Sequence, residues 1–240
     1  MSITQDRKVR QKLERENLIL ENAARLLARD GFQNLNLDEL ASSVEYSKGT
    51  LYLHFKTKED LVLSVATLSL KHRADLLERA VSFSDSTRER ARAMGFACCE
   101  FAVTHREFFA VTLMLQEISF WDRVSKDRQD QHLLVTQRTY DVVQRLVLDA
   151  KKCGDLPGKV SARDVTLSLM AITMGSHCIV TQPQLQTLYD IREPMPMLLM
   201  HQDRMMDGWG WKPISNGNRH VGLDRRIRRE LFPNATWLKT

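Results

Sequence analysis

Apolar residues recur along most of the chain at intervals of three and four residues, the spacing of a helix that buries one face. Ile19, Ala23, Leu26 and Leu27 follow this spacing until Asp30-Gly31, where a glycine suits the position just past a helix. No stretch combines strict alternation of apolar and polar residues with β-branched enrichment, which would indicate a strand. The pattern therefore predicts an all-α protein.

Capping residues mark where the predicted helices begin. Asn36, Ser47, Thr57, Ser86 and Ser161 each stand directly before an amphipathic stretch, and their side-chain oxygens can accept hydrogen bonds from the first backbone amides of a helix. The sequence predicts three helices before residue 57 and a long fourth helix from 58. Further helices are expected over 86–105, 126–152, 161–182 and 197–207, with an apolar segment at 108–121 and a short helix at 224–231.

Residues 37–55 predict two short helices joined by a three-residue turn, which is the spacing of a helix-turn-helix. The inner faces of the two helices would be formed by Leu37, Leu40, Ala41, Val44, Leu51 and Phe55. The outer face of the second helix would present Lys48, Thr50, Tyr52 and His54. Such a helix fits the major groove of DNA, although a pair of packed helices is also common in proteins without DNA.

Charge changes sign along this segment. Residues 30–45 contain four acids and no base, whereas residues 46–58 contain three lysines and no acid. We expect the acids of the first helix to be hidden and the second helix to present a basic face, as a protein that reads a groove requires.

The motif itself is specific. Ser47-Lys48-Gly49-Thr50-Leu51-Tyr52, then His54-Phe55 and Lys58-Glu59-Asp60-Leu61, together with the upstream pattern over 19–32, closely resembles the DNA-binding domain of the TetR family of bacterial transcriptional regulators. The resemblance covers about residues 15–65. It implies DNA contacts from the start of the second helix, from the recognition helix and from the start of the fourth helix, at Asn36, Leu37, Ser47, Lys48, Gly49, Thr50, Tyr52, His54 and Lys58.

The resemblance also implies a homodimer that binds a palindromic operator in the cytoplasm as a repressor, and a helical regulatory domain that binds a small molecule. The alternative is that the same fold serves as a protein-interaction module, with non-specific DNA binding or none. Two residues depart from the family pattern. Glu45 stands in the turn where the family usually has glycine, and a positive φ would cost it roughly 1 kcal/mol. Tyr46 stands where a small apolar residue is usual.

Net charge is unevenly distributed. Residues 212–240 carry seven basic and two acidic residues, so this stretch accounts for the whole net charge of +5. We therefore predict three parts: a DNA-binding domain over 1–56 with a basic arm over 1–15, a regulatory and dimerisation domain over 57–211, and a basic extension over 212–240. The arm either reaches DNA or is a solvated helix end. For the arginines at 225–229 we expect a solvated tail or salt bridges between subunits.

The regulatory domain offers candidate residues for two roles. An effector pocket is predicted from residues that mix adaptable apolar groups with a few polar ones, namely Phe101, His105, Phe109, Met114, Gln116, Trp121, Tyr140, Met170, Met174 and His177. For each of them ordinary core packing is the alternative. A dimer interface is predicted from one stripe of the helix at 161–182, namely Val165, Ser168, Leu169, Ile172, Ser176 and Ile179.

Other function classes find little support in the sequence. No apolar run reaches the ~18 residues of a membrane span, and the polar N-terminal stretch does not have the pattern of a signal peptide. Cys98, Cys99, Cys153 and Cys178 lack metal-ligand spacing, and we expect reduced thiols. We expect no enzymatic activity, metal or cofactor apart from the small-molecule effector.

Overall fold

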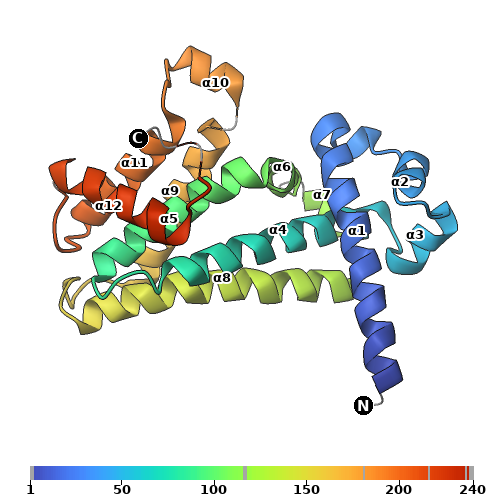
Figure 1. The fold of residues 1–240 in the computed structure, drawn as a ribbon, viewed down its shortest axis with the longest axis horizontal. Helices are drawn as coiled ribbons and strands as arrows, with labels where there is room; N and C mark the ends of the chain where they lie inside the picture. Colours follow the sequence, from blue (N-terminus) through green and yellow to red (C-terminus); the bar gives the residue numbers. More distant parts are fainter. Residues whose placement is uncertain (1–2, 116–117, 181, 216, 236, 238–240) are drawn as a thin grey trace. The chain divides into compact units, whose positions relative to one another are not determined.

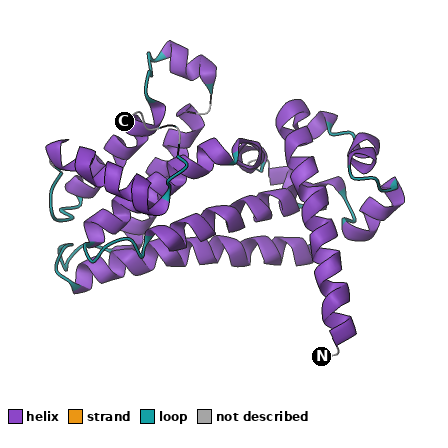
Figure 2. Ribbon diagram, viewed as in Figure 1, coloured by secondary structure: helices purple, strands orange, loops and turns teal. Residues whose placement is uncertain are grey.

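The computed structural model describes residues 3–115, 118–180, 182–215, 217–235 and 237. Within these ranges the secondary structure is helical and no strand occurs (Figure 2), so the predicted all-α fold is confirmed. The helices, labelled in Figure 1, are α1 Ile3–Asn34, α2 Leu37–Ser43, α3 Lys48–His54, α4 Lys58–Ala80, α5 Thr87–Thr104, α6 Arg106–Met114, α7 Ile118–Trp121, α8 Lys126–Lys152, α9 Ala162–Val180, α10 Pro183–Leu188, α11 Pro194–Gly208 and α12 Gly217–Leu231.

The chain divides into two compact units that do not follow the predicted boundaries. Unit 1 consists of residues 1–71 and 105–135, and unit 2 consists of residues 72–104 and 136–240. The predicted boundary at residue 56 differs because α4 and α8 each contribute to both units. The predicted boundary at residue 211 differs because the C-terminal helix packs within unit 2.

Unit 1 is built around the N-terminal helix. Ile19, Ala23 and Leu27 are fully buried on one face of α1, as their spacing predicted. Gly31 interrupts the helix with a φ of 76°, and one more helical turn leads to Asn34. Distant residues complete this unit, because Phe32 packs edge-on against Phe120 with ring centroids 5.8 Å apart.

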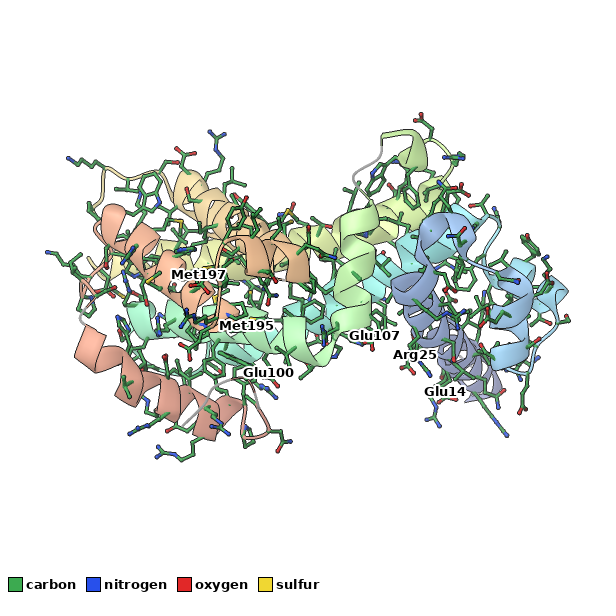
Figure 3. The ribbon with its side chains drawn as sticks, turned by 90° about the horizontal axis from the view of Figure 1, so that it is seen from above. Glu14, Arg25, Glu100, Glu107, Met195 and Met197 are labelled. Carbon is green, nitrogen blue, oxygen red and sulfur yellow. The ribbon has the colours of Figure 1, made fainter. Side chains whose placement is uncertain are left out.

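Unit 2 has α5 at its centre. Most of α5 is buried, including Phe96 and Cys99. Gly95 lies so close to α11 that a Cβ there would stand 1.9 Å from the side-chain oxygen of Gln202, so a larger residue would displace the Gln202 side chain. Glu100 on α5 and Met195 at the start of α11 appear in Figure 3, where the two helices lie side by side.

The basic C-terminal stretch is not a solvated tail, and the helix predicted at 224–231 begins earlier, at residue 217. Residues 217–231 form α12, in which Ile227 is fully buried, and Phe232 stacks on Phe96 of α5 with centroids 5.5 Å apart. Arg226 pairs with Glu89 of the same chain at 2.5 Å. The expectation of a solvated tail was therefore wrong, because the amphipathic helix has an apolar face that the core of unit 2 covers.

A network of buried ion pairs joins three helices of unit 2. Arg92 donates two hydrogen bonds to Asp224 of α12, at 2.7 and 2.8 Å, and also pairs with Asp203 of α11. Arg88 donates to Asp207 at 2.7 Å and to the carbonyl of Trp211 at 2.9 Å. Opposite charges in low-dielectric surroundings attract strongly and also fix geometry, so this network sets how α5, α11 and α12 pack.

Candidate nucleic-acid interface and internal cavity

The two short helices of unit 1 begin at the predicted capping residues. The side chain of Asn36 accepts hydrogen bonds from the backbone amides of Asp38 and Glu39, at 2.9 and 3.3 Å. Ser47 accepts one from the amide of Thr50 at 3.1 Å. Both residues belong to the predicted DNA-contacting set, and in this structure they fix where α2 and α3 start.

The turn between these helices has the predicted unusual backbone. Glu45 has a φ of 59°, in the left-handed region that favours glycine. The amide of Tyr46 donates to the carbonyl of Ala41 at 2.9 Å and closes the turn. The strain expected at Glu45 is therefore present, and the helix-turn-helix accommodates it.

The exposed face of α3 consists mainly of Lys48, Tyr52 and Leu53. The side chain of Lys48 is 47% exposed, and Tyr52 and Leu53 are 48% and 83% exposed. His54 departs from the predicted outer face, because its side chain is only 10% exposed and its Nδ1 lies 3.8 Å from a carboxylate oxygen of Glu16 in α1. One helical turn separates Lys48 from Tyr52, so these two side chains share a face.

The acids of α2 are not hidden, which corrects the predicted charge pattern. The ammonium of Lys48 pairs with Asp38 at 2.9 Å, and this hydrogen bond raises the pKa of Lys48. Arg29 of α1 pairs with Glu39 at 2.8 Å. These acids lie at the surface because a basic partner stands beside each of them. The recognition helix therefore presents a cation that is already paired.

Lys58 lies at the start of α4, where a DNA contact was expected. Its Nζ donates to the carbonyl of Gln33 at 3.1 Å and lies 5.0 Å from the ring centre of Phe32. Partial burial lowers the pKa of Lys58. Of the other predicted contacts, Gly49 has room for a side chain and Leu37 is half-buried. The predicted DNA contacts themselves remain predictions.

A basic groove of about 280 Å³ runs beside α3. It is lined by Lys8, Gln11, Lys12, Arg15, Leu53 and His54. Residues 6–8 and 10–15 of the basic arm are exposed along the N-terminal part of α1, and four of them line this groove. Helical spacing brings its charges together on one side of α1, next to the end of the recognition helix.

Arg128 supports the recognition helix and was missed by sequence reasoning. Its guanidinium donates to the carbonyl of His54 at 3.0 Å, pairs with Glu16 at 2.7 Å and lies 5.1 Å from the ring centre of Phe55. Arg128 thus satisfies a carbonyl at the C-terminal end of α3 and links that end to α1. It stands 74 residues from His54 in the sequence, so no local pattern could have indicated this contact.

Unit 2 contains an apolar cavity of about 370 Å³ between α4, α5, α8, α9 and α11. Its lining residues include two of the predicted effector contacts, Met170 and Met174. Leu77, Met94, Val143 and Leu146 form further apolar wall, and the polar groups in the lining are those of Arg73, Cys98, Thr139, Thr173 and Gln202.

The other predicted pocket residues lie elsewhere. Phe101, Tyr140 and His177 belong to unit 2 but are not part of the cavity lining, and Phe101 and His177 are buried. His105, Phe109 and Trp121 belong to unit 1. Gln116 and the side chain of Met114 lie outside the part of the chain that the structure describes.

The predicted dimer stripe of α9 is divided between interior and surface. Val165 and Ser176 are buried within the chain, whereas Ser168, Leu169, Ile172 and Ile179 are half-buried. The exposed apolar residues of α9 are on its other side, where Leu167 and Met174 are 48% and 50% exposed. The predicted interface remains a prediction.

Three further findings concern the cysteines, metal binding and membrane-spanning helices. The four cysteines have free thiols, and burial raises the pKa of both Cys98 and Cys99. Among the described residues, no three or more His, Cys, Asp or Glu side chains gather in a way that could hold a metal ion. In the same part of the chain, every helix is too short or too polar to cross a bilayer.

The N-terminal unit contains a segment that matches a known protein family. Residues 19–65 match the model of a family described as bacterial regulatory proteins, tetR family. The chain is 26% identical over 113 residues to the uncharacterized HTH-type transcriptional regulator YuxN of Bacillus subtilis, a match over 47% of this chain and 39% of that protein. The chain thus covers about two fifths of that relative. It is 24% identical over 172 residues to the HTH-type transcriptional regulator AcrR of Shigella flexneri, over 70% of this chain and 80% of AcrR.

Solved structures share the fold over most of the chain. The TetR family transcriptional regulator PfmR of Thermus thermophilus matches with a TM-score of 0.59 and 18% identity, over 83% of this chain and 96% of PfmR. The transcriptional regulator FadR of Bacillus subtilis, solved in complex with stearoyl-CoA, matches with a TM-score of 0.61 and 13% identity, over 82% of this chain and 98% of FadR. The capped helix-turn-helix and the match to the family model show that residues 19–65 form a helix-turn-helix domain of the TetR family of bacterial transcriptional regulators, and the fold over most of the chain is the one seen in solved TetR family regulators.

Proposed function

We propose that this protein is a homodimeric repressor that binds a palindromic DNA operator in the cytoplasm and releases it when a small molecule enters the cavity of unit 2. The observation that carries the DNA-binding part is the exposed face of α3. Lys48 and Tyr52 share this face at the surface, and the helix is held at both ends by Ser47 and Arg128.

Lys48 suits a phosphate contact although it is paired with Asp38. Exposed ion pairs contribute little to stability, because water and salt screen them. A DNA phosphate can therefore replace Asp38 as the partner of Lys48 at small cost. Tyr52 adds a phenol for a phosphate and a ring for a thymine methyl.

The effector part of the proposal rests on the cavity. Its volume of about 370 Å³ is within the range of small-molecule sites, and its walls are mostly apolar with a few polar groups. FadR of Bacillus subtilis, a protein of the same fold, was solved in complex with stearoyl-CoA. A ligand releases DNA only if it binds the non-binding conformation more tightly than the binding one.

A homodimer would place two recognition helices on half-sites related by a two-fold axis. Exposed apolar side chains of α10 and α11 support an interface in unit 2, with Leu188 and Met200 69% and 40% exposed. Light scattering coupled to size-exclusion chromatography gives the mass of the particle directly. A mass of one chain at micromolar concentration would overturn the homodimer.

The test of DNA binding is selection of bound fragments from genomic and random DNA. Wild type is compared with Lys48→Ala/Tyr52→Ala, and Lys159→Ala serves as a control for loss of an exposed lysine of unit 2. We expect a palindromic motif with wild type and the control, and none with the double variant. Equal enrichment by the double variant would overturn the assignment of α3 as the recognition helix.

A further inference from the structure

The cavity of unit 2 contains a cation without a counter-ion. Arg73 of α4 is part of the lining, and its Nε is buried without a hydrogen-bond partner. Burial lowers its pKa. A charged group in apolar surroundings is costly unless a partner compensates it. The acids nearest to Arg73 on α4 do not neutralise its charge, because Asp75 and Glu78 both pair with Arg138.

The groups beside Arg73 cannot supply the missing negative charge. Cys98 also lines the cavity, and burial raises the pKa of its thiol, which therefore stays protonated. His177 lies close enough to Arg73 to respond to its charge, and burial together with that charge lowers the pKa of His177 to about 4. The histidine is accordingly neutral at pH 7. No Asp or Glu is among the cavity residues.

The other polar side chains of the cavity lining offer a ligand few hydrogen-bonding groups, because they already bond within the protein. Gln202 donates from its Nε2 to Thr173 at 2.7 Å, and Thr173 in turn donates to the carbonyl of Leu169 at 2.7 Å. The oxygen of Gln202 is held against Gly95. A ligand would therefore meet one guanidinium as the strong donor and carbon almost everywhere else.

The mouth of the cavity lies along α9. Leu167, Ala171 and Met174 line the cavity and are also exposed at the surface, and their spacing places them on one face of the helix. The volume of about 370 Å³ corresponds to about a dozen groups of the size of a water molecule, taking ~30 Å³ for each. This limits the ligand to a small molecule.

We propose that the effector is a carboxylic acid of about eight to twelve carbon atoms with an apolar chain, whose carboxylate pairs with Arg73 while its chain fills the cavity. A single guanidinium matches a single negative charge, whereas a phosphate dianion would bring a second charge without a partner into apolar surroundings. This inference rests on the proposed effector role of the cavity.

The test is calorimetric titration of the full-length protein with four probes that share an eight-carbon tail. The probes are octanoate, octan-1-ol, octyl phosphate and octyltrimethylammonium. Because a hydrogen bond to a charged group contributes ~1.5–3 kcal/mol, we expect octanoate to bind at least about ten-fold more tightly than octan-1-ol. Tighter binding of the phosphate or the ammonium, or no binding of octanoate, would overturn the proposal.

Four variants locate the interaction. Arg73→Met should reduce octanoate binding to the level of octan-1-ol, and Arg73→Lys should restore part of the preference. Ala171→Trp places a large side chain at the exposed mouth and should weaken the acid and the alcohol alike. Arg145→Met removes an exposed arginine outside the cavity lining and should change nothing. Unchanged octanoate binding by Arg73→Met would show that Arg73 does not hold the carboxylate.

Two controls distinguish a loss of ligand binding from a loss of folding. A thermal melt of each variant shows whether it is folded, and Arg73→Lys keeps the charge if Arg73→Met does not fold. The titration needs no DNA, so a failure of operator selection would leave its result intact. Conversely, operator binding without octanoate binding would keep the regulator and reject this ligand class.

Discussion

The two units differ in whether their ion pairs are exposed or buried. In unit 1 the pairs formed by Lys48 and Arg29 lie at the surface, where Lys48 and Asp38 are 47% and 70% exposed. In unit 2, Arg88 and Arg92 pair with acids of α11 and α12 while their own side chains are only 6% and 8% exposed. An exposed pair can change partners, and a buried pair cannot. The contrast separates charges that are available for DNA from charges that hold helices together.

The largest expected effect comes from breaking the buried network. Arg92→Met leaves Asp203 and Asp224 without their main partner, and removing one member of a buried pair typically costs ~3–5 kcal/mol. We expect the unfolding of unit 2 to shift to much lower denaturant, as followed by circular dichroism. Arg29→Met is the matched control in unit 1 and should leave stability unchanged. Equal shifts for both variants would remove the distinction between the units.

Lowering the pH should reduce the folding stability of both units, because each contains a buried histidine whose pKa is lowered. Burial lowers the pKa of His132 in unit 1 and of His177 in unit 2 to about 4, from 6.5. Between these values the unfolded chain binds protons that the folded chain does not, so stability falls as the pH falls from about 6.5 to 4. The loss should be on the order of 2 kcal/mol for each histidine.

Single variants assign this pH dependence to each unit. His132→Gln and His177→Gln should each flatten the pH profile of thermal unfolding below pH 6.5. His201→Gln on α11, at a histidine that is only half-buried, is the control. A profile that keeps its full slope in both variants would show that neither histidine causes the acid sensitivity.

A smaller effect is expected on DNA affinity from the exposed pair. Lys48→Ala should weaken operator binding about ten-fold and reduce the slope of log K against log salt concentration by ~0.9, because one phosphate contact is lost. Asp38→Asn should act in the opposite direction, since it frees Lys48 and removes a negative charge beside DNA. Fluorescence anisotropy at several salt concentrations measures both. If Asp38→Asn weakened binding, the pair would position Lys48 rather than compete with DNA.

The smallest effect concerns the backbone of the turn. Glu45→Gly should stabilise unit 1 by at most about 1 kcal/mol, because glycine adopts a positive φ without strain. Asp190→Gly in unit 2, at a φ of 49°, should gain less, since Asp tolerates this region better than Glu. Glu45→Ala is the control and should give no gain. Denaturant midpoints of the three variants decide the order.

Local signals account for what the sequence predicted well. Asn36 and Ser47 cap their helices as predicted, and the resemblance, through the glycine usual at position 45, indicated the positive φ of Glu45. The boundaries of α8 at Lys126 and Lys152 also agree with the pattern. Each of these features depends on residues within a few positions of one another, which a sequence shows directly.

Features that depend on distant residues escaped prediction. Arg128 contacts the end of α3 from 74 residues away, and Arg73 lines a cavity with residues of four other helices. The inward turn of His54 toward Glu16 also follows from how α1 packs on α3. A charge pattern alone could not show that the acids of α2 have basic partners, because one of these partners, Arg29, belongs to α1.

The ion pairs of α5 also affect how the chain is made. Arg92 is separated from Asp224 by 132 residues, and Arg88 from Trp211 by 123. At a synthesis rate of ~5–20 residues per second, α5 leaves the ribosome on the order of ten seconds before these partners exist. During that time the helix that ends up most deeply buried in unit 2 is exposed. We therefore expect the chain to be most prone to aggregation from the time α5 emerges until α11 and α12 have been synthesised.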